Sequence, residues 1–243
     1  LGVLSVPLLY FLSLMVLGNK KESIIATLLF ICSVPLLLYF RTARYIAFQI
    51  PLTLLILWFY VQMLEHKKWS AVGFTVSSVL LFHTMYVQCA GVLMGIILHL
   101  LFFERSKDRV KQFFPPFLII FFFTAPWILY IYPVFEKVNN YYATAIGMPY
   151  KISVSALMKR FFAFVFQINN YLFPMVFLFF VFIKVHQKDH LAKYKYLVLL
   201  TVVIISTIGV STLNFIPLQQ YIAGILPLFY IFTSRILYQL RLA

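Results

Sequence analysis

The sequence predicts an all-α fold, a polytopic bundle of transmembrane helices in which residues 1–243 form a single transmembrane domain. The first reason is composition, because 63% of the residues are hydrophobic, 19% are aromatic and only 11% are charged. That composition, with a mean hydropathy of +0.97, leaves too little polar surface to cover a soluble globule. The second reason is that charges fall in short segments between apolar runs. The net charge of +14 therefore follows the positive-inside pattern of membrane proteins, and a nucleic-acid-binding function is excluded.

Apolar runs of about the length needed to cross a bilayer follow one another along the whole chain. Most of them are closed by a short basic turn. About nine spans are expected: 1–17, 23–40, 45–64, two short spans within 69–103, 113–135, 161–183, 196–213 and a last one that ends near Leu237.

Two of these boundaries depend on a physical argument. Pro35 has no backbone N–H and is expected to interrupt the second span. The uncharged stretch 69–103 would form a helix about 50 Å long, well beyond a hydrocarbon core of about 30 Å. We therefore expect a break near Tyr86 to Gly91, which produces two short spans.

The segment from residue 113 to residue 160 is expected to contain a kinked span and then a loop. Four prolines within 113–135 predict the kink. The longest hydrophilic loop is expected from Glu136 to Arg160, and the sequence SVSALMKRF near its end has the pattern of a short amphipathic helix.

The basic residues predict how the spans are oriented. If the turn 18–22 is cytoplasmic, 14 of the 20 Lys and Arg side chains fall on the cytoplasmic face. The segments that carry them are 18–22, 65–69, 104–112, 184–195 and the C-terminal tail. The six others are Arg41, Arg44, Lys137, Lys151, Lys159 and Arg160. This asymmetry repeats at successive turns and places the arginine pair on the outer face.

Arg41 and Arg44 are the first candidates for a binding site. They are three residues apart, so they share one face if the helix continues, and no acidic residue lies within fifteen positions on either side. Such a pair can bind an anion at the membrane surface. It can equally be a pair of interfacial anchors whose guanidinium groups reach water.

The other candidates are polar and aromatic residues on the predicted outer face. They are His83, Tyr86, Gln88, Lys159, Arg160, Asn169, Asn170, Asn214, Gln219, Gln220 and Tyr221. Basic, amide and tyrosine groups suit a lipid-linked phosphate with a hydroxyl-rich headgroup, although such residues are also common interfacial and helix-packing groups. His83 can serve in acid–base chemistry or in packing, and His99 fits a structural role better.

The chain contains no complete catalytic constellation. We find no carboxylate pair, Gly-rich phosphate loop, serine nucleophile motif or metal-ligand spacing in the sequence. No cofactor is identified and no divalent metal site is supported. Cys32 and Cys89 both fall in apolar spans without a paired spacing.

The ordered apolar motifs resemble a known family. The motifs are GVLSVPLLYFLSLMVLG, IIATLLFICSVPLLLYFRTARYIAF, LLFHTMYVQCAGVLMGIILHLL, FFFTAPWILYIYP and QQYIAGILPLFYIF. Together they are similar to the membrane domain of GT-C glycosyltransferases, of the dolichyl-phosphate-mannose protein mannosyltransferase-like and lipid A aminoarabinose transferase-like kind. The order Phe82-His83-Thr84 and the presence of Gln220 where the family has arginine depart from the family pattern.

The resemblance implies an inverting enzyme of the bacterial inner membrane whose active site faces outward. Its donor would be a sugar on a polyprenyl phosphate, and its acceptor a lipid, protein or glycan. Arg41 and Arg44 would bind the donor phosphate, with His83, Tyr86, Gln220 and Tyr221 as possible substrate contacts. The catalytic carboxylate would lie upstream of Leu1, and we expect the chain to be the interior of a longer protein because it starts without methionine or a basic flank.

Two other functions remain open. A polyprenyl-linked polysaccharide polymerase or ligase would use the same lipid, but such proteins need a larger external loop than 136–160. A lipid-linked sugar flippase or transporter would use no covalent chemistry, but every Asp, Glu, Lys and Arg here lies in a loop or at the end of a span.

Overall fold

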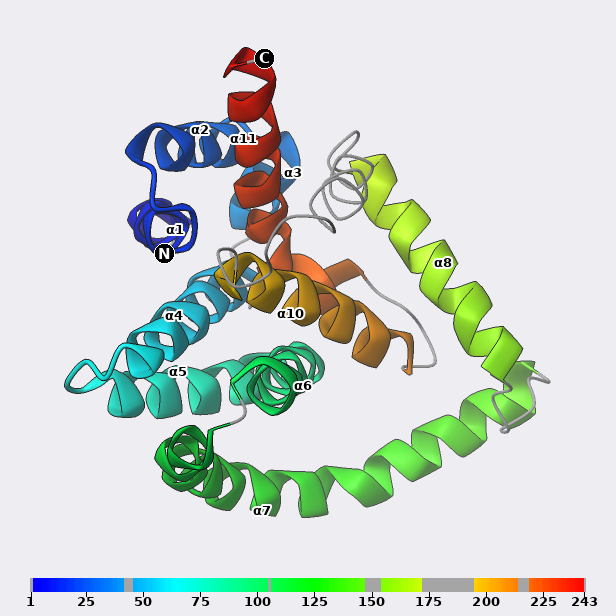
Figure 1. Cartoon of the computed structure of the whole chain (residues 1–243). Coiled ribbons are helices and arrows are strands. Elements are labelled where there is room, and N and C mark those ends of the chain that lie inside the picture. The colour runs from blue at the N-terminus through cyan, green and yellow to red at the C-terminus, as the bar shows by residue number, and fades with distance from the viewer. Residues whose placement is uncertain are drawn as a thin grey trace.

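The computed structural model describes residues 2–41, 46–104, 106–146, 154–171, 195–213 and 219–242, and these residues are arranged in helices without a strand (Figure 1). The elements are α1 (Gly2–Leu17), α2 (Lys20–Ile31), α3 (Val34–Arg41), α4 (Ile46–Leu64), α5 (Ser70–Thr84), α6 (Tyr86–Phe103), α7 (Lys107–Ile146), α8 (Val154–Tyr171), α10 (Lys195–Thr212), the 3-10 helix η2 (Gln219–Ile225) and α11 (Leu226–Leu242). The all-α prediction is confirmed for this part of the chain.

Five of the described helices are long and apolar enough to cross a bilayer. The segments are Ala47–Leu64, Tyr86–Phe103, Asp108–Val134, Lys195–Thr212 and Tyr221–Gln239, and Gly2–Leu17 and Ser70–Thr84 are shorter apolar helices. Length and composition of these helices are compatible with an integral membrane protein. The number of about nine spans stays a prediction.

Two predicted breaks are present. Met85 has an extended backbone (φ −156°, ψ 90°) that separates α5 from α6, one residue before the expected window. Likewise, α2 ends at Ile31 and α3 begins at Val34, next to Pro35. The cause is that a proline at position 35 cannot donate a hydrogen bond to the carbonyl of residue 31, and in a continuous helix a proline ring would crowd that carbonyl.

The expected boundaries between residues 136 and 161 are wrong. Helix α7 continues without interruption to Ile146, so no loop begins at Glu136. The SVSALMKRF segment is the beginning of α8, which continues to Tyr171. The predicted span that starts at residue 161 therefore leaves out the first turns of α8. Polar side chains do not end a helix, and the sequence has no Gly or Pro between Pro133 and Gly147. The kink expected from the prolines is visible as the bend of α7 in Figure 1.

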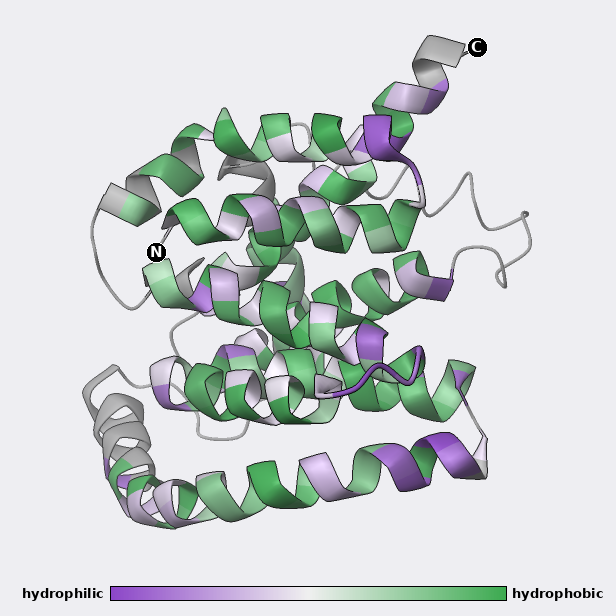
Figure 2. Ribbon diagram, turned by 90° about the vertical axis from the view of Figure 1, so that its left-hand side faces the viewer, coloured by the Kyte–Doolittle hydropathy of each residue, from purple (hydrophilic) through white to green (hydrophobic). Residues whose placement is uncertain are grey.

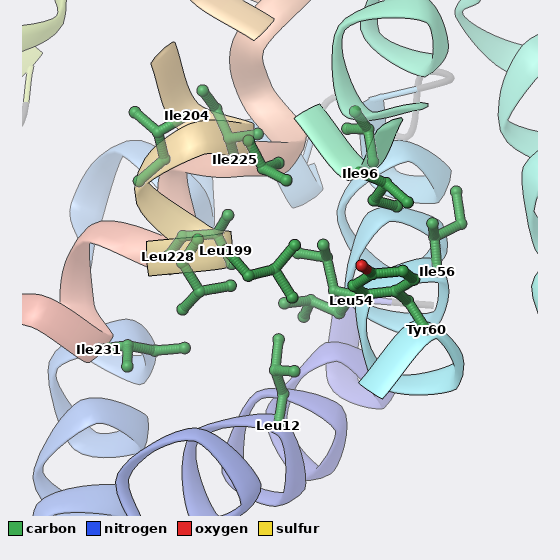
Figure 3. Close-up of a cluster of buried hydrophobic side chains, with 14 of the residues drawn as sticks. Leu12, Leu54, Ile56, Tyr60, Ile96, Leu199, Ile204, Ile225, Leu228 and Ile231 are labelled. Atoms are coloured by element: carbon green, nitrogen blue, oxygen red, sulfur yellow. The ribbon is translucent and has the colours of Figure 1, made fainter. Parts of the chain in front are cut away.

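Apolar side chains from the two ends of the chain meet in one core. In Figure 3, Leu12 of α1 faces Leu54 of α4 and Leu199 of α10, with Ile225 and Leu228 beside them. All five are fully buried. In a bilayer the lipid tails are as apolar as these side chains, so the contacts stabilise the bundle mainly by close packing.

Helices α6 and α10 approach closely because glycines face the neighbouring backbone. Gly91 and Gly95 are four residues apart on α6, the spacing of the small-residue motif that lets membrane helices pack tightly. The Ser206 hydroxyl of α10 donates to the Gly91 carbonyl over 2.9 Å. This interface fixes α10 against α6.

Helix α7 differs from the other membrane-length helices because little of it is covered. Only 11% of Asp108–Val134 is buried, against 72% of Ala47–Leu64. Phe113 and Phe117 pack on Phe74 of α5, whereas three consecutive residues from Phe121 to Phe123 are all exposed. Figure 2 shows α7 at the edge of the molecule, with polar first turns and an apolar body. We interpret the exposed part of this helix as facing lipid.

Candidate functional site

Hydrogen bonds and ion pairs join the three turns that the charge count places on the cytoplasmic face. Glu104, which follows α6, pairs with Lys195 Nζ at 3.6 Å and lies 4.0 Å from Arg109 Nε. The Tyr196 hydroxyl donates to Glu65 Oε1 over 3.5 Å. The ends of α4 and α6 and the starts of α7 and α10 therefore meet, as the alternation of basic turns predicts.

At the opposite end of α4 and α6, three backbone and side-chain groups form a buried polar contact. The Gln88 amide nitrogen donates to the Thr53 hydroxyl over 2.6 Å. The Gln88 amide oxygen accepts from the Gly224 backbone N–H over 3.2 Å. Because Thr53 belongs to α4, Gln88 to the first turn of α6 and Gly224 to η2, one amide side chain joins three elements.

A second buried glutamine lies one turn before Thr53 on α4. Gln49 lies in the first turn of α4, four residues before Thr53, so the two residues share a face of the helix. Its side chain is fully buried, and neither its amide nitrogen nor its amide oxygen has a hydrogen-bond partner among the described residues. We call Gln49, Thr53, Gln88 and Gly224 the outer polar cluster, because the charge count predicts that this end of the bundle faces outward.

Glycine is required at position 224. A Cβ atom at this position would overlap the amide nitrogen of Gln88 and would lie 2.5 Å from the Thr53 hydroxyl oxygen. The absence of a side chain therefore lets the backbone of η2 approach α4 and α6. Only with this approach can Gln88 reach both of its partners.

Replacing Gln88 with methionine is expected to lower the free energy of unfolding by at least about 2 kcal/mol. The new side chain is similar in size but leaves the Gly224 N–H and the Thr53 hydroxyl buried without a partner, at about 1–3 kcal/mol for each lost group. The measurement is unfolding in bicelles of both single variants, Gln88→Met and Thr53→Val, and of the double variant. Effects that simply add up in the double variant would contradict a direct bond between the two side chains.

The predicted phosphate and substrate residues flank this cluster in the sequence. Arg41 is the last residue of α3, and Arg44 lies outside the described residues, two positions before α4 begins. Gln220 and Tyr221 belong to η2, four and three residues before Gly224, and Tyr221 is half-buried. The structure thus brings the η2 backbone that carries these two residues against α4 and α6.

His83 and Tyr86 lie on either side of the break at Met85. The exposed His83 ring packs edge-to-face against Trp127 of α7, with 6.3 Å between ring centroids. Tyr86 is the first residue of α6 and is 37% exposed. Among the described residues, His83 therefore has aromatic neighbours and no carboxylate partner of the kind that acid–base catalysis uses.

His99 has the arrangement of a structural residue. Its Nε2 lies 3.3 Å from the Lys195 carbonyl oxygen, which can only accept, so Nε2 carries the proton. Nδ1 then accepts from the Tyr60 hydroxyl over 2.8 Å. Both ring nitrogens are used, and the residue joins α4, α6 and α10 at the end opposite to the outer polar cluster.

The sequence reasoning included Gln88 among outer-face residues but did not single out Gln49 or Thr53. The signal for Gln49 was present, because a glutamine within the apolar run IAFQIPLTLL is an intramembrane polar group that needs a partner. The other members of the cluster could not be grouped from the sequence. For Thr53, the partner Gln88 is thirty-five positions away, and Gly224 comes near α4 only in the folded chain.

The chemistry that the described residues offer at the outer polar cluster is neutral hydrogen bonding. Amide and hydroxyl groups can bind a hydroxylated ligand, and no group of three His, Cys, Asp or Glu side chains suited to a metal ion occurs in the described part of the chain. Cys32 and Cys89 are both free thiols, the first exposed and the second buried. No family model, no curated protein and no solved structure matches this chain.

Proposed function

We propose that this chain is a membrane glycosyltransferase of the GT-C class, which transfers a sugar from a polyprenyl phosphate to an acceptor at the outer face of the membrane. The observation that supports this most is the position of the outer polar cluster. It begins in the first turn of α4, directly after the Arg41–Arg44 segment, and lies at the opposite end of α4 and α6 from the charged turns.

The arginines and the neutral polar groups suit the two parts of such a donor, its phosphate and its sugar. Guanidinium groups can hold phosphate oxygens in pairs and stabilise the negative charge that grows on a leaving polyprenyl phosphate. Amides and hydroxyls suit the sugar. In the proposed reaction an acceptor hydroxyl attacks the anomeric carbon with inversion, its proton passes to a carboxylate, and the polyprenyl phosphate leaves.

Arg44→Ala is expected to weaken the binding of polyprenyl phosphate by about 10- to 100-fold, the effect of losing one charged hydrogen-bonded contact. The affinity of Arg44→Lys for polyprenyl phosphate is expected to lie between those of the unaltered protein and Arg44→Ala, because lysine retains the charge but not the bidentate geometry. Binding is measured by titrating the purified protein in lipid nanodiscs. The control is Lys21→Ala, which removes an exposed cation at the start of α2, in the turn predicted on the other face.

An unchanged affinity in Arg44→Ala and Arg41→Ala would contradict the phosphate role. A fall of the same size in Lys21→Ala would show that the lipid responds to net charge and not to this pair.

A flippase for a lipid-linked sugar is the second candidate, favoured by one observation. Glu22 is fully buried, although the sequence placed it in a turn, and one of its carboxylate oxygens has no partner in the described part of the chain. Buried carboxylates inside membrane proteins often serve coupled transport. Release of free polyprenyl phosphate when donor and acceptor are supplied identifies a transferase, whereas movement of the intact donor between leaflets identifies a flippase.

A further inference from the structure

The Gln49 side chain is a buried amide to which the described part of the chain makes no hydrogen bond. It is fully buried, and both of its polar atoms are without a hydrogen-bond partner among the described residues. Burying an amide in this way is unfavourable, and folded proteins rarely contain one unless a water or a ligand completes it. The hydroxyls of Ser78 and Thr207 are also unpaired, but a helical hydroxyl can turn to the carbonyl one turn earlier, which the Gln49 amide cannot do as easily.

The residues near Gln49 on α4 and earlier in the sequence indicate that it belongs to a polar site. One turn further along the same face of α4, the Thr53 hydroxyl is bonded to Gln88, which also holds the backbone of η2. In the other direction the chain leads to Arg44, five residues before Gln49. In the sequence of α4 and the segment before it, Gln49 therefore lies between Thr53, which takes part in a built polar contact, and the arginines to which we assign the phosphate.

The chemistry of the amide restricts the ligand. The side chain offers N–H donors and a carbonyl acceptor side by side, and carries no charge. A phosphate would use only the donors and a cation only the acceptor. A hydroxyl group donates and accepts at once, so a polyol that presents adjacent hydroxyls satisfies both atoms.

We propose that Gln49 binds a hydroxyl group of the sugar in a polyprenyl-phosphate-linked donor, and that it contributes to recognition of the sugar and not of the phosphate. This inference rests on the proposed function and adds a specificity-determining residue to it. The sugar would lie beside the start of α4 and η2.

The test compares two ligands on one variant. Gln49→Met keeps the length of the side chain and removes the amide. The purified protein in nanodiscs is titrated with polyprenyl phosphate and with the same lipid bearing mannose, glucose or aminoarabinose. We expect the unaltered protein to bind at least one sugar-bearing lipid more tightly than the bare phosphate. Gln49→Met should weaken that binding by roughly tenfold and leave the affinity for the bare phosphate unchanged.

A matched control is available on the same helix. Gln62 is half-buried near the other end of α4, so Gln62→Met makes the same chemical change away from the outer polar cluster. It should alter neither affinity. Gln49→Leu repeats the test with a differently shaped apolar side chain, and both Gln49 variants should unfold at or above the temperature of the unaltered protein, because they remove an unpaired buried amide.

Three results would overturn the inference. If Gln49→Met leaves both affinities unchanged, the amide faces only an internal water or a void. If it weakens both ligands equally, the residue acts through the fold. If no sugar-bearing lipid binds more tightly than polyprenyl phosphate, there is no sugar site to assign. Failure of the unaltered protein to bind polyprenyl phosphate at all would instead refute the proposed function itself.

Discussion

Replacing Arg235 with methionine is expected to lower the free energy of unfolding by about 3 to 5 kcal/mol. Arg235 Nη1 donates to Glu22 Oε1 over 2.6 Å, and the Asn19 side-chain amide donates to the same oxygen over 3.1 Å. Glu22 is fully buried. Without the arginine, its negative charge would remain in a low-dielectric environment with only a neutral partner. The expected loss is large because a buried charge is left without its counter-charge, not because the pair itself is strongly stabilising.

This ion pair also joins distant parts of the chain. Glu22 lies in the first turn of α2, where Asn19 is the N-cap and accepts from the Lys21 N–H, whereas Arg235 lies in α11. The double variant Glu22→Gln/Arg235→Met removes both charges and should recover most of the lost stability. Unfolding by steric trapping in bicelles measures all three proteins. A loss below about 1 kcal/mol in Arg235→Met would indicate that water or lipid headgroups reach Glu22.

Gly91→Leu and Gly95→Leu are each expected to destabilise the protein by about 2 to 3 kcal/mol. Even a Cβ at position 91 would lie 2.5 Å from the Thr207 Cα, and a Cβ at position 95 would lie 2.6 Å from the Val203 Cα. Both obstacles are backbone atoms of α10, so a rotamer change cannot relieve them. The two helices must separate, which also breaks the bond between the Ser206 hydroxyl and the Gly91 carbonyl.

The same helix pair provides a matched control. A Cβ at Gly209 of α10 would meet nothing within 4 Å. Gly209→Ala should therefore leave stability unchanged or raise it by up to about 1 kcal/mol, since alanine favours helix over glycine. The measurement is again the free energy of unfolding in bicelles. Equal effects at positions 91, 95 and 209 would show that helix propensity, and not the close approach of α6 and α10, determines the result.

Those parts of the fold that depend on length and local chemistry could be predicted from the sequence. The break at Met85 followed from a 35-residue apolar stretch that is too long for one crossing, and the break before Pro35 followed from the missing N–H of proline. The alternation of basic turns agrees with the contacts that join Glu65 to Tyr196 and Glu104 to Lys195.

Other parts could not be predicted because they depend on contacts between distant residues or on a weak local signal. Polarity after Glu136 predicts a loop, but polar residues are tolerated in a helix, and α7 continues to Ile146, directly before Gly147. Glu22 and Arg235 are 213 positions apart, and no local pattern pairs them. The outer polar cluster likewise forms only when α4, α6 and η2 come together, although the isolated glutamine at position 49 gave a signal for one of its members.

Equilibrium binding to the unaltered protein tests most directly whether the protein binds a lipid-linked phosphate at its outer face, as we propose. Protein in nanodiscs is titrated with polyprenyl phosphate and, separately, with the polyprenol of the same chain length. We predict that the phosphate-bearing lipid binds at least about tenfold more tightly, the contribution of one charged hydrogen-bonded contact. Equal affinity for the two lipids would contradict the phosphate site and, with it, the proposed transfer of a sugar from a polyprenyl phosphate.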